Sequence, residues 1–326
     1  MHGGDLAAAA ARFPGARQPW VDLSTGINPR SYPVGAITSA LWQRLPDPAA
    51  LRHLEHTAAR AYKIPSHADI VAGPGTQAII QLLPRLFPAR SVAVLGFGYG
   101  EHPAVWRAAG AEVHVVAGLG ELAEADVAVV INPNNPDGRL CSAPQLAEVA
   151  RRMVARGGTL VVDEAFMDVV EPGQSLVPTL PDAGVVVLRS FGKFFGLGGL
   201  RLGFAVADPE TTARIRAALG AWPVSGPALS IGAQALADGA WRAGALTWLR
   251  ASANRLDTLL TGAGLTVLGG TTLFRLAAAP DAASTYDRLG RAGIFVRPFS
   301  ERPTWLRFGL PGDEPAWRRL AEALGP

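Results

Sequence analysis

The sequence predicts an α/β protein with a large domain, built on a mainly parallel sheet flanked by helices, and a smaller α+β domain. Short runs rich in Val, Ile and Leu alternate with amphipathic segments up to about residue 207. After residue 227 the pattern changes to a long helical stretch followed by short mixed elements. Continuous apolar runs separated by helical segments are typical of parallel strands that are buried on both faces.

The predicted strands of the large domain lie at residues 91–95, 111–117, 127–132, 159–164, 186–190 and 203–207. Between them, segments such as 143–158 repeat apolar residues at helical spacing. In sheets of this kind, ligands bind beyond the carboxyl ends of the strands. The residues that follow each run are therefore the candidate site.

The smaller domain begins with a predicted helical stretch at 228–264 and ends with a predicted helix at 313–325. Mixed elements at 265–278 and 293–299 lie between them. We expect a large domain at 20–235, and a small domain formed by 236–326 together with an N-terminal arm, 1–19.

The composition excludes several classes of protein. The net charge is +3 and the arginines are scattered, without the basic run expected of a nucleic-acid partner. No apolar run approaches the roughly 18 to 20 residues that span a bilayer. One cysteine, Cys141, allows no internal disulfide and no cysteine-rich zinc site. No basic segment precedes the alanine run near the N-terminus, so we expect a cytoplasmic protein.

Two further patterns have ordinary explanations. Gly96, Gly98 and Gly100 follow a strand but lack the spacing of a dinucleotide-binding loop, so they indicate a turn. His53 and His56 have helical spacing that can suit a metal, but exposed structural histidines are far more common. We expect no metal.

Four polar segments follow strands or precede helices: GPGTQ at 73–77, NPNNPDG at 132–138, VVDEAFMD at 161–168 and SFGKFFGLGGLRLGF at 190–204. Backbone N–H groups of Gly75, Thr76 and Gln77 can hold a phosphate at the start of a helix. Asp163 ends a hydrophobic strand, where a carboxylate is seldom placed for packing.

Lysine is rare in this chain, since Lys63 and Lys193 are the only two among 30 basic side chains. Arginine stays protonated and cannot form a Schiff base, whereas a lysine amine can. Because Lys193 lies between Phe191 and Phe194, a plain surface role does not suit it. Lys193 is therefore the only candidate for covalent chemistry within a motif.

Together these segments resemble the fold type I family of pyridoxal 5′-phosphate enzymes, the aminotransferase class I/II superfamily, and most nearly its histidinol-phosphate aminotransferase branch. The resemblance covers nearly the whole chain. It is carried by N-P-x-x-P-x-G, D-E-A, S-x-x-K and an arginine, Arg201, eight residues after the lysine. It implies an enzyme of the fold type I architecture with pyridoxal 5′-phosphate as cofactor and a homodimeric assembly.

The resemblance also implies a role for each motif residue. Lys193 would attach the cofactor and move a proton at the substrate α-carbon, and Asp163 would keep the pyridine nitrogen protonated. Asn135 would hydrogen-bond the ring phenolate oxygen. The cofactor phosphate would be held by Arg201, Ser190, Gly75, Thr76 and Gln77.

Three positions depart from the family pattern. Phe166 stands where many relatives have a tyrosine that shares the phenolate oxygen. His102 falls at the position of the aromatic residue that stacks on the cofactor, with Tyr99 as a rival. Leu45 replaces a tyrosine that reaches the cofactor phosphate of the neighbouring subunit.

The N-terminal HGGD and DLSTGINPRSYP at 22–33 resemble the threonine-phosphate decarboxylases of cobalamin biosynthesis. The resemblance implies decarboxylation of L-threonine O-3-phosphate to (R)-1-aminopropan-2-yl phosphate. A histidinol-phosphate-type aminotransferase is the alternative. A non-catalytic sensor of the same fold would need a DNA-binding segment or a lost lysine, and the sequence shows neither.

A phosphorylated amino acid carries two anionic groups. We expect the substrate to be bound by His2, Gly3, Gly26, Asn135, Arg297 and Arg307, with Ser24 and Asn28 on the same side. The apolar neighbours of Arg307 in TWLRFGL would bury its charge unpaired, which a bound anion would resolve. The division of carboxylate and phosphate between the two arginines stays open.

Overall fold

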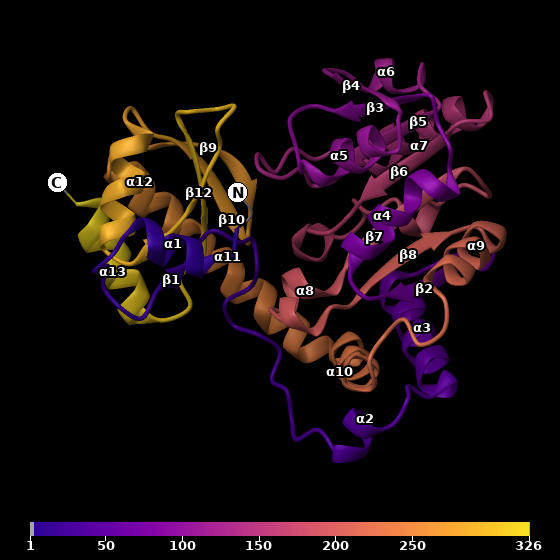
Figure 1. Cartoon of the computed structure of the whole chain (residues 1–326), viewed down its shortest axis with the longest axis horizontal. Coiled ribbons are helices and arrows are strands. Elements are labelled where there is room, and N and C mark those ends of the chain that lie inside the picture. Colours follow the sequence, from indigo (N-terminus) through magenta and orange to yellow (C-terminus); the bar gives the residue numbers. More distant parts are fainter. Residues whose placement is uncertain (1–2, 326) are drawn as a thin grey trace.

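The structure is a computed structural model that describes residues 3–325. Figure 1 shows two lobes, joined by the long helix α11 (Gly239–Gly262) and by the N-terminal segment of the chain. The larger lobe contains a seven-stranded sheet of order β2-β8-β7-β6-β5-β3-β4. Its strands are β2 (Asp69–Gly73), β3 (Ser91–Leu95), β4 (Glu112–Val116), β5 (Val127–Ile131), β6 (Thr159–Asp163), β7 (Val185–Ser190) and β8 (Gly203–Ala207).

Helices cover both faces of this sheet because successive side chains of each strand point to opposite faces. One apolar cluster packs the sheet against α4 (Thr76–Leu86), α5 (Glu101–Ala108) and α9 (Pro209–Leu219). On the other face lie α3 (Pro48–Tyr62), α7 (Ala143–Val154) and α10 (Gly226–Ala237). Three shorter helices, α2 (Ser39–Gln43), α6 (Leu119–Leu122) and α8 (Phe191–Phe194), complete this lobe.

All six predicted strands are present in this sheet, with ends that agree within one residue. β2 is an additional strand that the sequence analysis did not predict. β8 runs antiparallel to both β2 and β7, whereas the other pairings are parallel. The mainly parallel sheet expected from the sequence is confirmed.

The smaller lobe contains the antiparallel sheet β12-β13-β10-β9 and the parallel pair β1-β11. Its elements are α1 (Leu6–Arg12), β1 (Val21–Asp22), β9 (Thr266–Thr271), β10 (Phe274–Ala278), α12 (Ala282–Arg291), β11 (Ile294–Phe295), β12 (Arg297–Pro298), β13 (Trp305–Gly309) and α13 (Glu314–Leu324). Because Val21 and Asp22 pair with Ile294 and Phe295, this segment belongs with the smaller lobe. The predicted start of the large domain at residue 20 precedes this pairing by one residue.

The predicted helical stretch at 228–264 is two helices, α10 and α11, that meet at Asp238. The Asp238 carboxylate accepts a hydrogen bond from Trp241 N and caps α11. Within residues 3–325, no helix is both long enough and apolar enough to cross a membrane.

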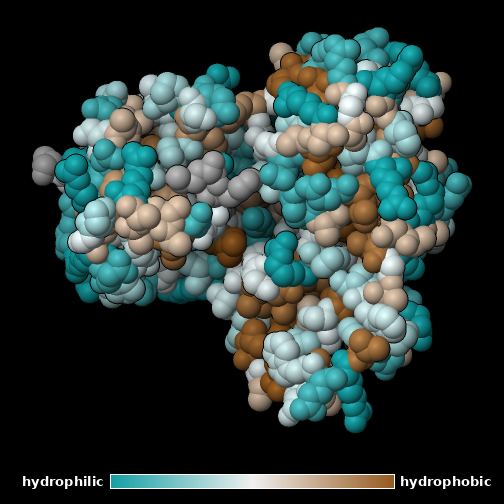
Figure 2. Space-filling view, in the orientation of Figure 1, coloured by the Kyte–Doolittle hydropathy of each residue, from teal (hydrophilic) through white to brown (hydrophobic). Residues whose placement is uncertain are grey.

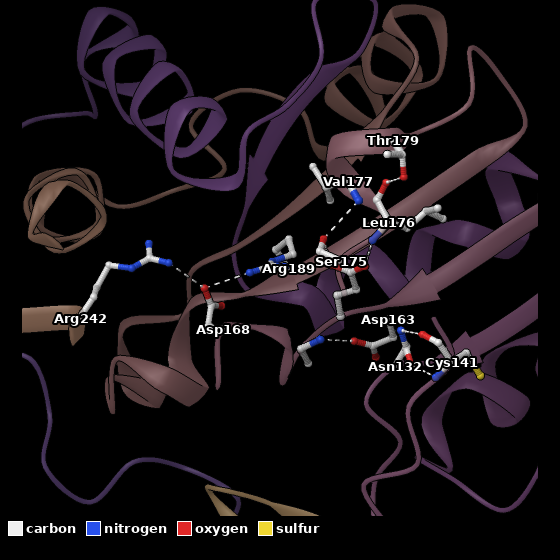
Figure 3. Close-up of polar contacts among 12 residues, drawn as sticks. Asn132, Cys141, Asp163, Asp168, Ser175, Leu176, Val177, Thr179, Arg189 and Arg242 are labelled. Carbon is white, nitrogen blue, oxygen red and sulfur yellow. Dashed lines mark hydrogen bonds and ion pairs between the residues drawn. The ribbon is translucent and has the colours of Figure 1, made fainter. Parts of the chain in front are cut away.

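A buried charge network lies behind the ends of β6 and β7 (Figure 3). Arg189 is 2.8 Å from Glu164 and 2.9 Å from Asp168, and all three side chains are at most 5% exposed. Arg242, near the start of α11, lies 3.6 Å from Asp168. Glu164 and Arg189 are the chain neighbours of Asp163 and Ser190, so this network fixes the two strand ends that carry those residues.

Candidate active site

A cavity of about 230 Å³ opens at the carboxyl ends of the central strands. Its lining includes eight of the nine residues predicted to hold the cofactor: Gly75, Thr76, Gln77, Asn135, Asp163, Ser190, Lys193 and Arg201. We call it the cofactor cavity. Segments that are up to 126 residues apart in sequence, from Gly75 to Arg201, thus meet at one place.

A second cavity of about 190 Å³ adjoins the first and shares Tyr99, Asn135, Phe166 and Lys193 with it. We call it the substrate cavity. The predicted substrate residues Gly3, Gly26, Asn135, Arg297 and Arg307 all line it. His2 lies outside the described residues.

Lys193 lies on the one-turn helix α8 that directly follows β7. Its carbonyl accepts a hydrogen bond from Asn28 N at 2.9 Å, which ties α8 to the N-terminal segment. Burial lowers the pKa of the Lys193 amine to about 8, with Arg307 and Arg201 adding to the effect and Asp163 opposing it. A substantial neutral fraction near neutral pH makes this amine a competent nucleophile.

Asp163 ends β6, and its carboxylate has two partners on its own side of the cavity. Ala165 N donates to Oδ1 at 3.0 Å, and His102 Nε2 lies 2.9 Å from Oδ2. His102 is fully buried and does not line the cofactor cavity. The structure thus places the His102 imidazole against Asp163, and not on the cavity wall where a stacking ring is expected.

Tyr99, the rival candidate for the stacking residue, lines both cavities and so lies where a stacking ring is expected. Its ring meets His102 edge-on, with centroids 6.2 Å apart. Burial, with the nearby Glu101 and Asp163, raises the pKa of Tyr99 to about 12. The phenol is therefore neutral at physiological pH.

The phosphate end of the cofactor cavity is built around the start of α4. Gly75 has φ 85° and a Cβ there would lie 2.7 Å from the Arg201 guanidinium, so only glycine fits this turn. Ser190 lines the cavity at the end of β7. Helix N-terminal N–H groups, a hydroxyl and a guanidinium are the kinds of donor that suit a dianionic phosphate.

Two arginines face the substrate cavity: Arg307 is buried, and Arg297 is half-buried. Arg307 donates from Nη1 to Asn135 Oδ1 and from Nη2 to Ser24 O at 2.6 Å. Two guanidinium nitrogens, Nε of Arg307 and Nη1 of Arg297, are buried and have no hydrogen-bond partner within residues 3–325. Burial lowers the pKa of both groups, to about 10 for Arg307. Buried cations with unpaired donors indicate a cavity for an anionic ligand.

The N-terminal arm packs on the segment that carries Ser24. Gly4 N donates to Ser24 Oγ at 2.7 Å, and Ser24 Oγ donates to Asp22 Oδ1 at 2.6 Å. A Cβ on Gly3 would lie 2.4 Å from Ser24 O, so the arm approaches too closely for any side chain there. Asn28 does not line either cavity: its amide is buried and donates to Phe194 O at 2.9 Å, so it positions α8 instead.

The remaining walls are apolar, and most were not predicted. Phe166 packs edge-on against Phe274 at 5.0 Å, and the Lys193 amine lies 5.7 Å from the Phe166 ring centroid. Ile27, Ile131 and Leu202 are further apolar residues of the cofactor cavity, and Phe299 lines the substrate cavity. In the sequence these side chains cannot be told apart from ordinary core residues, because each belongs to an apolar run or lies beside one.

Leu45, His53 and His56 lie away from both cavities. Leu45 is 69% exposed and lines a surface groove together with His53. Both histidines are exposed on α3. Within residues 3–325, no group of His, Cys, Asp and Glu has the geometry of a metal site.

The fold and the cofactor cavity define the class of protein: the chain belongs to the aminotransferase class I and II family, whose family model matches residues 36–324. It is 47% identical to a threonine-phosphate decarboxylase from Sinorhizobium sp over 99% of this chain and 97% of that protein. It is 41% identical to a threonine-phosphate decarboxylase from Pseudomonas aeruginosa, over 99% and 96% of the two chains.

Solved structures share the fold. The structure of histidinol-phosphate aminotransferase from Sinorhizobium meliloti in complex with pyridoxal-5′-phosphate has a TM-score of 0.81 to this chain, at 23% identity. The similarity covers 98% of this chain and 92% of that one. The fold class expected from the sequence is confirmed.

Pyridoxal 5′-phosphate is the cofactor of this family, and the cofactor cavity fits it. The amine of Lys193, with its lowered pKa, lies at the cavity beside the carboxylate of Asp163. The glycine turn at Gly75, against which Arg201 packs, leaves room for a phosphate where a side chain would fill it. The chemistry of these residues therefore matches the cofactor: an amine for its aldehyde, a carboxylate for its ring nitrogen, and a glycine turn with a guanidinium for its phosphate.

Proposed function

We propose that this protein decarboxylates L-threonine O-3-phosphate to (R)-1-aminopropan-2-yl phosphate, with pyridoxal 5′-phosphate as cofactor, in the cytoplasmic synthesis of cobalamin. The observation that carries the proposal is the pair of arginines, Arg297 and Arg307, in the cavity next to Lys193, each with a buried N–H group that has no hydrogen-bond partner within residues 3–325. Similarity to two threonine-phosphate decarboxylases over nearly the whole chain supports it.

Arg297 and Arg307 match a substrate that has two anionic groups on a short carbon chain. A carboxylate and a phosphate would satisfy the donors that lack partners, and so would offset the burial of two cations. The neutral walls Phe166 and Phe299 exclude water around these contacts, which strengthens them. An amino acid without a phosphate would leave one arginine unpaired.

When bound, the cofactor supplies an electron sink for the pair left at the α-carbon as the carboxylate departs. Asp163, held by His102 Nε2 and Ala165 N, presents a carboxylate that stabilises a protonated ring nitrogen. Lys193 is the group at the cavity that can deliver the proton that replaces carbon dioxide at the α-carbon. Whichever of Arg297 and Arg307 binds the carboxylate would orient it for cleavage, while the other binds the phosphate.

A second subunit is part of this proposal. Trp42, Leu45 and Trp222 are 67%, 69% and 55% exposed, which is unusual for large apolar side chains. α2, which carries Trp42, packs on α10, which begins just after Trp222. Figure 2 shows hydrophobic residues gathered over the part of the molecule where α2, α3 and α10 lie in Figure 1. We propose that this surface contributes to a homodimer.

Absorbance of the pyridoxal-phosphate-loaded protein tests the substrate. Addition of L-threonine O-3-phosphate should shift the cofactor band, and L-threonine should do so only at concentrations at least about 10-fold higher, because it lacks the charged contacts of the phosphate. Histidinol phosphate is the matched alternative. A shift with histidinol phosphate and none with threonine phosphate would support an aminotransferase instead.

A further inference from the structure

A chain of two hydrogen bonds runs along the wall that the two cavities share. The Tyr99 hydroxyl donates to Gln77 Oε1 at 3.0 Å, and Gln77 Nε2 donates to Glu101 Oε2 at 2.7 Å. Gln77 is the second residue of α4, and Glu101 is the first residue of α5. The chain therefore links the beginnings of two helices through the ring that lines both cavities.

The direction of each hydrogen bond follows from the groups themselves. An ionised carboxylate can only accept, so the amide nitrogen of Gln77 must face Glu101. This orientation leaves the amide oxygen facing Tyr99, whose neutral phenol supplies the proton. A rotated amide would set its oxygen against the carboxylate, so the orientation of Gln77 is well determined.

The backbone around Tyr99 does little to fix its ring. Tyr99 stands between Gly98 and Gly100, in the turn that joins β3 to α5. Glycine allows a wide range of backbone conformations. His102 packs against the ring edge-on, and the apolar cluster between the sheet and α4, α5 and α9 packs against it as well. The hydrogen bond to Gln77 fixes the hydroxyl end of the ring.

We propose that Gln77 is a positioning residue, whose side chain holds the Tyr99 ring as the wall against which the cofactor lies. The side chain then acts through Tyr99 and is not itself a ligand of the cofactor phosphate. The contact with the phosphate would be made by its backbone N–H. This inference rests on the proposed cofactor site, but its first test does not depend on it.

Tyrosine NMR tests the contact directly in the full-length protein. The chain has only four tyrosines, so a ring-labelled sample gives few signals and Tyr99→Phe assigns the one that matters. Gln77→Met should shift or broaden the Tyr99 signal and leave the other three in place. Gln81→Met, the same change on an exposed position of α4, is the control. An unchanged Tyr99 signal in Gln77→Met would overturn the proposal.

A double-mutant cycle then tests the role toward the cofactor. Gln77→Met should raise the apparent dissociation constant of pyridoxal phosphate about 3- to 10-fold, the usual effect of one lost hydrogen bond. In the Tyr99→Phe background the same change should have an effect below about 2-fold, because its target is gone. An equal effect in both backgrounds would show that the Gln77 side chain contacts the cofactor directly, and would contradict the proposal. A wild-type protein that binds no pyridoxal phosphate would contradict the proposed function, while the NMR result would still stand.

Discussion

Lys193 shows how neighbouring residues set the chemistry of one side chain. Its amine is desolvated and lies near two guanidinium groups, and both effects favour the neutral form. Asp163 alone opposes them. The result is an amine that can lose its proton close to physiological pH, which no arginine in this chain can do.

The pKa of Lys193 predicts the pH dependence of cofactor attachment. A lowered pKa means that the reactive neutral amine dominates above about pH 8, whereas an ordinary lysine would need about pH 10.5. The rate of covalent attachment, followed by absorbance after mixing with pyridoxal phosphate, should therefore rise up to about pH 8 and then level off. Arg307→Met removes a positive charge, and should move this transition to higher pH. An identical profile in the variant would contradict the electrostatic account.

At the residue scale, the sequence predicted the polar members of the cofactor cavity but not what each of them contacts. Lys193, Asp163 and Arg201 lie in motifs whose spacing is specific, so they could be placed without a structure. His102 and Asn28 could not, because whether a side chain faces a cavity or a neighbouring loop depends on tertiary packing. Their buried contacts with Asp163 and Phe194 O are visible only in the fold.

At the scale of elements, the ends of β6 and β7 are held by the buried charge network of Arg189, Glu164, Asp168 and Arg242. Glu164 also accepts hydrogen bonds from Ser175 Oγ and Leu176 N, and the Arg189 guanidinium lies 4.3 Å from the centroid of the Tyr62 ring (Figure 3 shows the polar contacts). Removal of one member leaves its partners charged and buried.

Arg189→Met should therefore lower the free energy of unfolding by about 3 to 5 kcal/mol, since two buried carboxylates lose their partner. Arg242→Met is the matched control, because its ion pair is longer, at 3.6 Å, and its side chain is 24% exposed. We expect it to cost less than about 1 kcal/mol. Urea unfolding measures both values. Equal effects of the two substitutions would argue against the network as described.

Five of the six predicted strands of the large sheet are continuous apolar runs that are almost entirely buried, and for this reason they could be predicted well. The sixth, β4, is an exposed edge strand with Val at three of its five positions. Elements that exist only because they pair with a distant strand could not be predicted from the sequence. β1 is two residues long and joins the smaller lobe only through its partner β11, far along the chain. The break at Asp238 is equally hidden, since the apolar pattern continues on both sides of a single capping residue.

The whole molecule places its active site where the two lobes meet, with Lys193 from the large lobe and Arg307 from the small one. The exposed tryptophans lie apart from this junction, beside α2 and α10. An uncovered apolar surface of this kind is typical of an interface between subunits.

Sedimentation should therefore give a mass of about twice the 34.1 kDa of one chain. Trp42→Asp places a charge on the exposed apolar surface, and should shift the equilibrium toward the monomer. Arg151→Asp, on the solvent-exposed side of α7, serves as the control and should leave the mass unchanged. A wild-type protein that sediments as a monomer at all concentrations would rule out the homodimer.

The central claim is that this site breaks the bond between the α-carbon and the carboxylate. Single-turnover mixing of the loaded enzyme with L-threonine O-3-phosphate, labelled in the carboxylate, tests it most directly. We predict one labelled carbon dioxide released per active site, with the cofactor recovered as the aldehyde and the product as an amine. Retention of the label, with accumulation of the pyridoxamine form of the cofactor, would show transamination and contradict the account.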